Sequence, residues 1–265
     1  MRAMIVGDVV GKPGREALAR YLPALRDQYY PDVVVANAEN VAGGIGITPD
    51  LANELLERIG VDVITLGNHA WAKREVHDYL NREKRILRPA NYPPGAPGRG
   101  CGIYETPAGR VAVLSLQGRV FMDPIDDPFR AVDTLLADLP TDVTTVLVDL
   151  HAEATSEKAV FGWYVDGRCS AVVGTHTHVQ TADERILPQG TAFITDVGMT
   201  GPTDSVIGMD VEGVLGRFTT MLPHRFEVAS GPSQLCAVIV HTDPWTGKGT
   251  TIERIRIGEE EGSRP

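Results

Sequence analysis

Five short clusters of polar residues, all of types that bind metal ions, each follow a hydrophobic segment of this chain. The hydrophobic segments are residues 3–6, 33–36, 63–66, 146–150 and 171–173, and the polar residues that follow them are Asp8, Glu39, Asn40, Asn68, His69, His151, His176 and His178. Carboxylate oxygens, amide oxygens and imidazole nitrogens are ligands that divalent transition metals accept. The residue types and their positions therefore predict a metal site.

Each hydrophobic segment is expected to form a buried strand, and open α/β sheets bind their ligands beyond the carboxyl ends of the strands. Each cluster also has an ordinary explanation when it is taken alone. Asp8 could cap a loop, His151 could be a buried core histidine, and a His-x-His sequence such as residues 176–178 is often a surface feature. The repetition of such residues at five strand ends favours a metal site over coincidence.

The composition of the clusters favours two metal ions. Two ions about 3.5–4 Å apart need a shared anionic ligand and several neutral ligands, so that the site keeps the positive charge that polarises a phosphate. One aspartate, one glutamate, one or two asparagines and three histidines satisfy this requirement. His176 and His178 are expected on one face of an extended segment, because side chains alternate along a strand.

The first half of the chain alternates strands and helices. The expected elements, in order, are a strand at 2–7, a helix at 15–28, a strand at 32–37, a helix at 49–59, a strand at 61–66 and a helix at 71–82. Thr48 is a good N-cap with Pro49 at the first helical position, and Gly60 ends that helix. This order predicts a parallel sheet with right-handed crossovers.

The second half predicts a different arrangement. A loop rich in Pro and Gly precedes a hairpin, two helices flank the strand before His151, and the final strands suggest antiparallel pairing in a second sheet. The expected elements are a loop at 89–100, hairpin strands at 101–105 and 110–116, helices at 127–139 and 156–164, and strands at 192–195, 234–241 and 250–257. With no repeat and no clear linker, residues 1–265 are expected to form a single domain, frayed at the charged residues 259–265.

The charge balance restricts the partners of the protein. The 265 residues include 25 basic and 35 acidic ones, for a net charge of −10, which argues against an extensive surface for nucleic acid or anionic membrane. A small phosphorylated substrate is still compatible, because metal ions can supply a local positive field. The three cysteines are widely spaced, and no hydrophobic stretch approaches the roughly 18 residues of a membrane span. The expected location is the cytoplasm.

Other catalytic motifs are absent or incomplete. The glycine-rich residues 7–14 lack the spacing of a nucleotide-binding P-loop and of a dinucleotide-binding loop. Ser156, Ser205 and Ser233 lack the Gly-x-Ser-x-Gly context of a serine hydrolase. These gaps leave the metal site as the strongest candidate for chemistry.

The motifs resemble those of a known superfamily. Gly7-Asp8, Gly67-Asn68-His69 and the run Gly174 to His178 are similar, in sequence and order, to the blocks of the calcineurin-like metallophosphoesterases. The resemblance extends from residue 7 to residue 178. It implies an α/β fold with two packed mixed β-sheets flanked by helices, a four-layer α/β/β/α sandwich.

Two departures place the chain within that superfamily. Val10 stands where many members have a metal-binding His, and Glu39 replaces the usual bridging Asp. Asn40 could supply the missing ligand. This variant set, together with residues 151–158 and 195–202, resembles the YmdB-like branch. The resemblance implies a phosphodiesterase acting on cyclic nucleotides, 2′,3′-cyclic ones in particular, with iron or manganese and with zinc as the alternative metal.

The resemblance also suggests a role for each candidate residue. The expected ligands are Asp8, Glu39, Asn40 and His178 at one metal, and Glu39, Asn68, His151 and His176 at the other. A hydroxide formed between the metals would attack phosphorus, and His69 would protonate the leaving oxygen. One alternative for His69 is a purely structural role. The alternatives for the protein are a phosphomonoesterase, a nuclease and a metal-holding regulatory protein. The expected partner is a small phosphodiester, and a homo-oligomer is left open.

Overall fold

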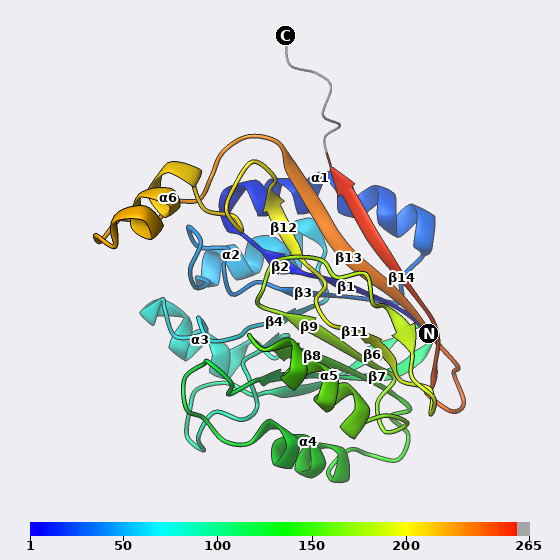
Figure 1. Cartoon of the computed structure of the whole chain (residues 1–265). Helices are drawn as coiled ribbons and strands as arrows, with labels where there is room; N and C mark the ends of the chain where they lie inside the picture. Colours follow the sequence, from blue (N-terminus) through cyan, green and yellow to red (C-terminus); the bar gives the residue numbers. More distant parts are fainter. Residues whose placement is uncertain (259–265) are drawn as a thin grey trace.

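Two β-sheets pack face to face, with helices covering their outer faces (Figure 1). The computed structural model describes residues 1–258, so the expectation of a frayed end at residues 259–265 lies outside the described residues. Helices α1 and α2 lie on one side of the paired sheets, and α4 and α5 lie on the other (Figure 1). The predicted four-layer α/β/β/α fold is confirmed.

The first sheet contains the amino-terminal strands and the carboxyl-terminal hairpin. Its order is β2-β12-β13-β1-β3-β4-β5, with β14 paired to β13. Its strands are β1 (Arg2–Val6), β2 (Asp8–Val9), β3 (Val33–Asn37), β4 (Val63–Thr65), β5 (Ile86–Leu87), β12 (Met199–Pro202), β13 (Ser233–Thr242) and β14 (Gly249–Gly258). The central strands β1, β3, β4 and β5 are parallel, so their carboxyl ends share one edge of the sheet.

The second sheet carries the other half of the site. Its order is β10-β11-β9-β8-β7-β6, and β7, β8, β9 and β11 are parallel. Its strands are β6 (Cys101–Thr106), β7 (Gly109–Gln117), β8 (Thr145–His151), β9 (Ala171–Thr175), β10 (Arg185–Ile186) and β11 (Ala192–Ile194). The predicted hairpin around residues 106–109 is confirmed as the antiparallel β6–β7 pair.

The helices connect the strands and cover the sheets. They are α1 (Gly11–Tyr29), α2 (Pro49–Asn53) with a π-helical continuation (Glu54–Ile59), a 3₁₀ turn (Arg74–Val76), α3 (His77–Arg82), α4 (Pro128–Ala137), α5 (Thr155–Tyr164) and α6 (Val211–Thr220). Among the described residues, none of these helices combines the length and hydrophobicity needed to cross a bilayer.

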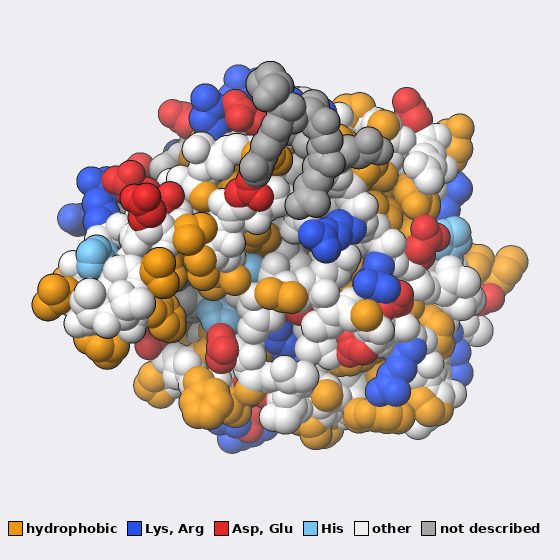
Figure 2. All heavy atoms as spheres, turned by 45° about the horizontal axis from the view of Figure 1, so that its top comes forward, with side chains coloured by type: hydrophobic (Ala, Val, Ile, Leu, Met, Phe, Trp, Pro, Cys, Tyr) orange, Lys and Arg blue, Asp and Glu red, His pale blue; other side chains and the backbone are white. Residues whose placement is uncertain are grey.

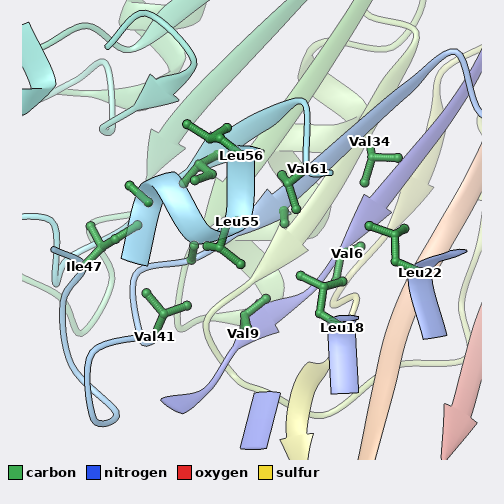
Figure 3. Close-up of a cluster of buried hydrophobic side chains, with 14 of the residues drawn as sticks. Val6, Val9, Leu18, Leu22, Val34, Val41, Ile47, Leu55, Leu56 and Val61 are labelled. Carbon is green, nitrogen blue, oxygen red and sulfur yellow. The ribbon is translucent and has the colours of Figure 1, made fainter. Parts of the chain in front are cut away.

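Alternation of side chains along the strands produces separate hydrophobic layers. On β3, Val34 packs towards the helices, where Figure 3 shows it with Leu18 and Leu22 of α1. The neighbouring Val35 instead lies in the core between the two sheets, with Val113 of β7. Strand β3 is buried on both faces, which explains why its sequence is a continuous hydrophobic run.

Local signals predicted the second helix well and the third helix only in part. The side chain of Thr48 accepts a hydrogen bond from Leu51 N at 3.3 Å, Pro49 begins the helix, and Gly60 ends it with φ = 92°. The predicted helix at 71–82 is wrong in its first half, where the chain forms turns before α3. The Trp71 ring packs edge-on against His77 with ring centroids 5.6 Å apart, a tertiary contact that the sequence pattern does not show.

The carboxyl-terminal strands were assigned correctly but not all were paired correctly. Strands β13 and β14 pair antiparallel as predicted. The expectation that this hairpin belongs to a second sheet is wrong, because β13 also pairs with β1 and the hairpin extends the first sheet. Residues 192–195 were expected in this antiparallel group, but β11 lies in the second sheet and runs parallel to β9.

Candidate metal centre

All eight candidate residues lie at the shared edge formed by the carboxyl ends of parallel strands. They follow β1, β3, β4 and β9 or, for His151, end β8. Hydrogen-bond-range contacts link each of them to at least one of the others. The two sheets thus bring together side chains up to 170 positions apart in the sequence, from Asp8 to His178. Their roles as ligands remain a prediction.

Glu39 lies at the middle of the cluster and is buried. Its Oε1 atom is 3.1 Å from His151 Nε2 and 3.2 Å from His69 Nδ1. Its Oε2 atom accepts a hydrogen bond from the backbone N of His69 at 2.9 Å. Glu39 therefore contacts groups that follow or end strands of both sheets, and its role as a bridging ligand remains a prediction.

One side of the cluster is formed by Asn68, His151 and His176. The Asn68 Oδ1 atom lies 3.0 Å from His151 Nε2, and His176 Nδ1 lies 3.0 Å from the same nitrogen. Glu39, His151 and His176 each present one donor atom, and these three atoms all lie within 4.8 Å of one another. This convergence of one carboxylate and two imidazoles is typical of a transition-metal site.

The other side is formed by Asp8, Asn40 and His178. His178 Nε2 lies 3.7 Å from Asp8 Oδ1 and 3.3 Å from Asn40 Nδ2. The Asn40 Oδ1 atom instead faces His69 Nδ1 at 2.7 Å. Asn40 thus presents its amide nitrogen to His178, and ligation by its oxygen on that side requires the carboxamide to turn over.

Each of the three candidate histidine ligands has its second ring nitrogen engaged by an oxygen atom. His151 Nδ1 is 2.9 Å from Thr175 Oγ1, His176 Nε2 is 3.1 Å from Glu153 Oε2, and His178 Nδ1 is 2.8 Å from the Ile207 carbonyl oxygen. Such contacts fix the tautomer and leave the opposite nitrogen free to bind a metal. The opposite nitrogens are those that point into the cluster.

The buried Asp8 carboxylate supports the same interpretation. Its Oδ2 atom accepts a hydrogen bond from His176 N at 3.1 Å, but among the described residues its buried Oδ1 atom has no hydrogen-bond partner. Burial raises the pKa of Asp8 to about 6, although the nearby His178 and His151 oppose this effect. An unsatisfied buried carboxylate oxygen is costly unless a cation compensates it. The residues present therefore fit a metal ion.

The neighbouring histidines have pKa values that move in opposite directions. Burial would lower the pKa of His151, but the carboxylates of Glu39, Asp8 and Asp149 outweigh burial and raise it to about 9. Burial and the charge of His151 lower the pKa of His176 to about 3. Without metal, the His151 imidazolium therefore pairs with Glu39 at neutral pH, while His176 is neutral.

The backbone at residues 176–178 differs from the predicted extended segment. His176 has φ = 96° and His178 has φ = 65°, values that non-glycine residues rarely adopt. Each such residue costs on the order of 1–3 kcal/mol. The prediction that an extended backbone aligns the two rings is therefore wrong. A tight turn directs His176 towards His151 and His178 towards Asp8 instead.

Two glycines allow the close approaches around the site. A Cβ atom on Gly67, the residue before Asn68, would lie 2.1 Å from the His151 ring. A Cβ atom on Gly174 would lie 1.8 Å from the Thr195 carbonyl oxygen. A side chain at either position would displace the segments that carry the histidines. Steric crowding therefore explains why both motifs contain glycine.

Several supporting residues were not predicted from the sequence. Asp149 is buried beneath the site, where it accepts hydrogen bonds from Thr175 Oγ1 at 2.7 Å and Asn37 Nδ2 at 3.1 Å. Thr175 also contacts His151, so Asp149, Thr175 and His151 form a chain of hydrogen bonds. Burial raises the pKa of Asp149. A lone carboxylate inside a hydrophobic strand was the available signal for this group.

The space-filling view shows histidine side chains in a recess of the surface, with hydrophobic side chains nearby (Figure 2). On this face Lys and Arg side chains are scattered among Asp and Glu side chains (Figure 2). His69 and His176 are partly exposed, whereas Asp8, Glu39 and His151 are buried. The site is thus open to a small ligand from one side and closed beneath.

Comparison with known proteins identifies the family. Residues 4–255 match the model of the YmdB-like protein family. The chain belongs to this family. The match covers nearly the whole chain, so the resemblance of the motifs to the YmdB-like branch is confirmed.

Individual proteins of similar sequence and structure agree with this assignment. The chain is 49% identical, over 98% of both sequences, to a 2′,3′-cyclic-nucleotide 2′-phosphodiesterase of Bacillus subtilis. A structure described as a novel phosphatase of Mycoplasma pneumoniae has a TM-score of 0.92 at 35% identity, covering 99% of this chain and 95% of that one. A hypothetical protein of Thermus thermophilus has a TM-score of 0.91 at 45% identity, covering 98% of this chain and 100% of that one.

Proposed function

We propose that this protein is a metal-dependent phosphodiesterase that hydrolyses 2′,3′-cyclic nucleotides. The observation that carries the proposal is the convergence of carboxylate, amide and imidazole groups around Glu39, with the outer nitrogens of the histidines already engaged. The Bacillus subtilis relative, which is named for this substrate class, supports the choice of substrate.

The proposed ligands divide into two sets that share Glu39. Asp8, Asn40 and His178 complete one set, and Asn68, His151 and His176 complete the other. Iron or manganese is the proposed metal, with zinc as the alternative, since all three accept oxygen and imidazole ligands. When bound, two such ions would acidify a water molecule and offset the charge of the phosphate.

His69 is the proposed proton donor. Its backbone N and its Nδ1 atom are held by Glu39 and Asn40, and among the described residues no hydrogen bond engages its Nε2 atom. The side chain is 32% exposed, so a substrate can reach it. In the proposed reaction water attacks phosphorus, the bond from phosphorus to one ribose oxygen breaks, and His69 gives its proton to that oxygen. The product is a nucleoside monophosphate.

A cavity next to the centre offers space for the rest of a small substrate. It has a volume of about 550 Å³ and is lined by His178, Gln180, Gln234 and Arg256, among others. This volume is in the range of small-molecule sites. Of the eight candidate residues, only His178 lines this cavity, so the cavity adjoins the proposed centre on its His178 side.

The test is a panel of phosphoesters presented to protein reconstituted with Mn²⁺ or Fe²⁺. The panel contains a 2′,3′-cyclic nucleotide, a 3′,5′-cyclic nucleotide, a nucleoside monophosphate and a short single-stranded RNA. The highest kcat/KM is expected for the 2′,3′-cyclic nucleotide, and Asp8→Ala prepared in the same way controls for contaminating enzymes. Preferred hydrolysis of the monophosphate or the RNA would overturn the proposed substrate. The cytoplasmic location and assembly into homo-oligomers remain predictions.

A further inference from the structure

Two buried charged residues to which the proposed chemistry assigns no role form an ion pair inside the protein. Lys158, from the motif at residues 151–158, and Asp196, from the motif at residues 195–202, form an ion pair with 2.7 Å between Lys158 Nζ and Asp196 Oδ2. Their side chains are 1% and 0% exposed. Removing two charges from water is costly, and a buried ion pair adds little stability compared with hydrophobic residues. The contacts of this ion pair indicate a role other than stability.

The contacts of Asp196 lead directly to the candidate histidines. Its Oδ2 atom accepts hydrogen bonds from Thr177 N at 3.2 Å and from Thr177 Oγ1 at 2.7 Å, in addition to the Lys158 ammonium. Its Oδ1 atom accepts a hydrogen bond from Gly198 N at 2.7 Å. Asp196 is therefore fixed on both oxygens, and it holds Thr177 through both the backbone and the side chain.

Thr177 is the middle residue of the turn that separates the two histidines. Both flanking residues, His176 and His178, have positive φ, so the turn requires anchors that keep it in this conformation. Asp8 Oδ2 accepts a hydrogen bond from His176 N at 3.1 Å, and the His178 carbonyl accepts one from Met199 N at 3.1 Å. Asp196 supplies the anchor at the centre of the turn.

The ion pair also connects the turn to the element that follows His151. Lys158 lies on α5, which begins four residues after His151 at the end of β8. Its ammonium group lies 3.4 Å from Thr177 Oγ1 as well as against Asp196. Movement of α5 relative to the turn would break these contacts, so the pair fixes His176 relative to His151.

We propose that Lys158 and Asp196 are positioning residues that act through Thr177. They hold the turn so that His176 points to the Asn68 and His151 side of the centre and His178 points to the Asp8 side. This inference rests on the proposed metal centre. It adds that metal affinity depends on a network whose members bind no metal themselves.

The test compares Thr177→Ala with Thr177→Ser. Serine keeps the hydroxyl that donates to Asp196 and loses only the methyl group, whereas alanine loses both. Thr177 is partly exposed, so neither substitution leaves a sealed cavity. Mn²⁺ is titrated into metal-stripped protein and followed by calorimetry and by the electron paramagnetic resonance of bound Mn²⁺, with the Tm measured in chelator.

Loss of a partner that orients metal ligands weakens metal binding by about 10–100-fold. We expect Thr177→Ala to weaken Mn²⁺ binding by at least about tenfold. Thr177→Ser should bind Mn²⁺ like the wild type, and the Tm of all three metal-free proteins should agree. Asp196→Asn should have a larger effect, because in either orientation its amide group faces a backbone N–H, that of Thr177 or that of Gly198.

Three results would overturn the inference. Wild-type affinity in Thr177→Ala would show that the anchor does not control the ligands. Equal losses in the alanine and serine variants would assign the effect to the methyl group. Failure of the wild-type protein itself to bind Mn²⁺ would overturn the proposed metal centre, and the inference with it. The first two results leave the proposed function standing.

Discussion

Asp8 and Glu39 are both buried carboxylates of the centre, yet their neutralisation should change the stability of the metal-free protein in opposite directions. Burial raises the pKa of Asp8 from 3.8 to about 6, so its ionised form is disfavoured in the folded state. For Glu39, burial alone would raise the pKa, but the charge of His151 and hydrogen bonds from His151 and His69 outweigh burial and hold it well below 4.5. Its ionised form is therefore favoured.

The magnitude for Asp8 follows from proton linkage. A rise of its pKa from 3.8 to about 6 means that ionisation at neutral pH costs the folded metal-free protein about 3 kcal/mol. The substitution Asp8→Asn removes this cost while keeping the size of the side chain. We expect metal-free Asp8→Asn to gain up to about 3 kcal/mol of unfolding free energy, and the Tm should rise by about 2–4 °C per kcal/mol for a chain of this size.

The stability effects of Asp8 and Glu39 also depend on pH. Because the folded pKa of Asp8 is the higher one, the metal-free wild type should lose stability as pH rises from about 4 to about 6, and Asp8→Asn should not. Glu39→Gln should instead lower the stability of the metal-free protein at neutral pH, since it removes a favoured charge beside His151.

The assay is chemical denaturation of the three proteins in chelator across this pH range, repeated with Mn²⁺. Mn²⁺ should stabilise the wild type strongly and Asp8→Asn weakly, because the variant lacks a ligand. Lower stability of metal-free Asp8→Asn, or changes of the same sign in both variants, would refute the reasoning.

Three further outcomes are expected. His69→Ala should keep its metals and lose kcat/KM on a 2′,3′-cyclic nucleotide by on the order of 10²–10⁴-fold. The loss on bis-p-nitrophenyl phosphate should be far smaller, because p-nitrophenolate leaves without a proton. Equal losses on the two substrates would indicate that His69 positions the phosphate. Gly67→Ala should lose metal content at an intact fold, because its Cβ would lie 2.1 Å from the His151 ring; elemental analysis and circular dichroism check this. Because the pKa of His151 is raised to about 9, its ion pair with Glu39 should stabilise the metal-free protein fully below pH 6.5. This stabilisation should be lost as pH rises through about 9. Mn²⁺ binding near pH 7.5 should accordingly release at least about one proton, that of His151. Calorimetry in buffers of different ionisation enthalpy measures this release, and a heat independent of buffer would contradict it.

The strand pattern allowed the layers and the strand-end edge to be predicted, because both depend on local signals. Residues 33–36 form an unbroken hydrophobic run, and the helix after Thr48 has its cap and its terminating glycine in the sequence. In parallel strands these signals are sufficient to place Asp8, Glu39 and Asn68 at one edge.

The features that were missed depend on contacts between distant segments. The pairing of β11 with β9 and the meeting of Lys158 with Asp196 have no local sequence signature. Helix α6 was not predicted, because Gly213 and Gly216 lower its intrinsic helix propensity by about 1 kcal/mol each. The positive φ values of the two histidines arise from the anchored turn, which the His-x-His spacing does not reveal.

Metal stoichiometry tests the binuclear centre most directly. Protein purified without chelator, or reconstituted with Mn²⁺ or Fe²⁺, should contain close to two transition-metal ions per chain by elemental analysis. Glu39→Ala should lose both ions, because Glu39 contacts Asn40 of one proposed ligand set and His151 of the other. Asp8→Ala should retain about one ion, because Asp8 belongs to one set only. A metal content near zero after reconstitution, or two ions retained in Glu39→Ala, would contradict a centre bridged by Glu39.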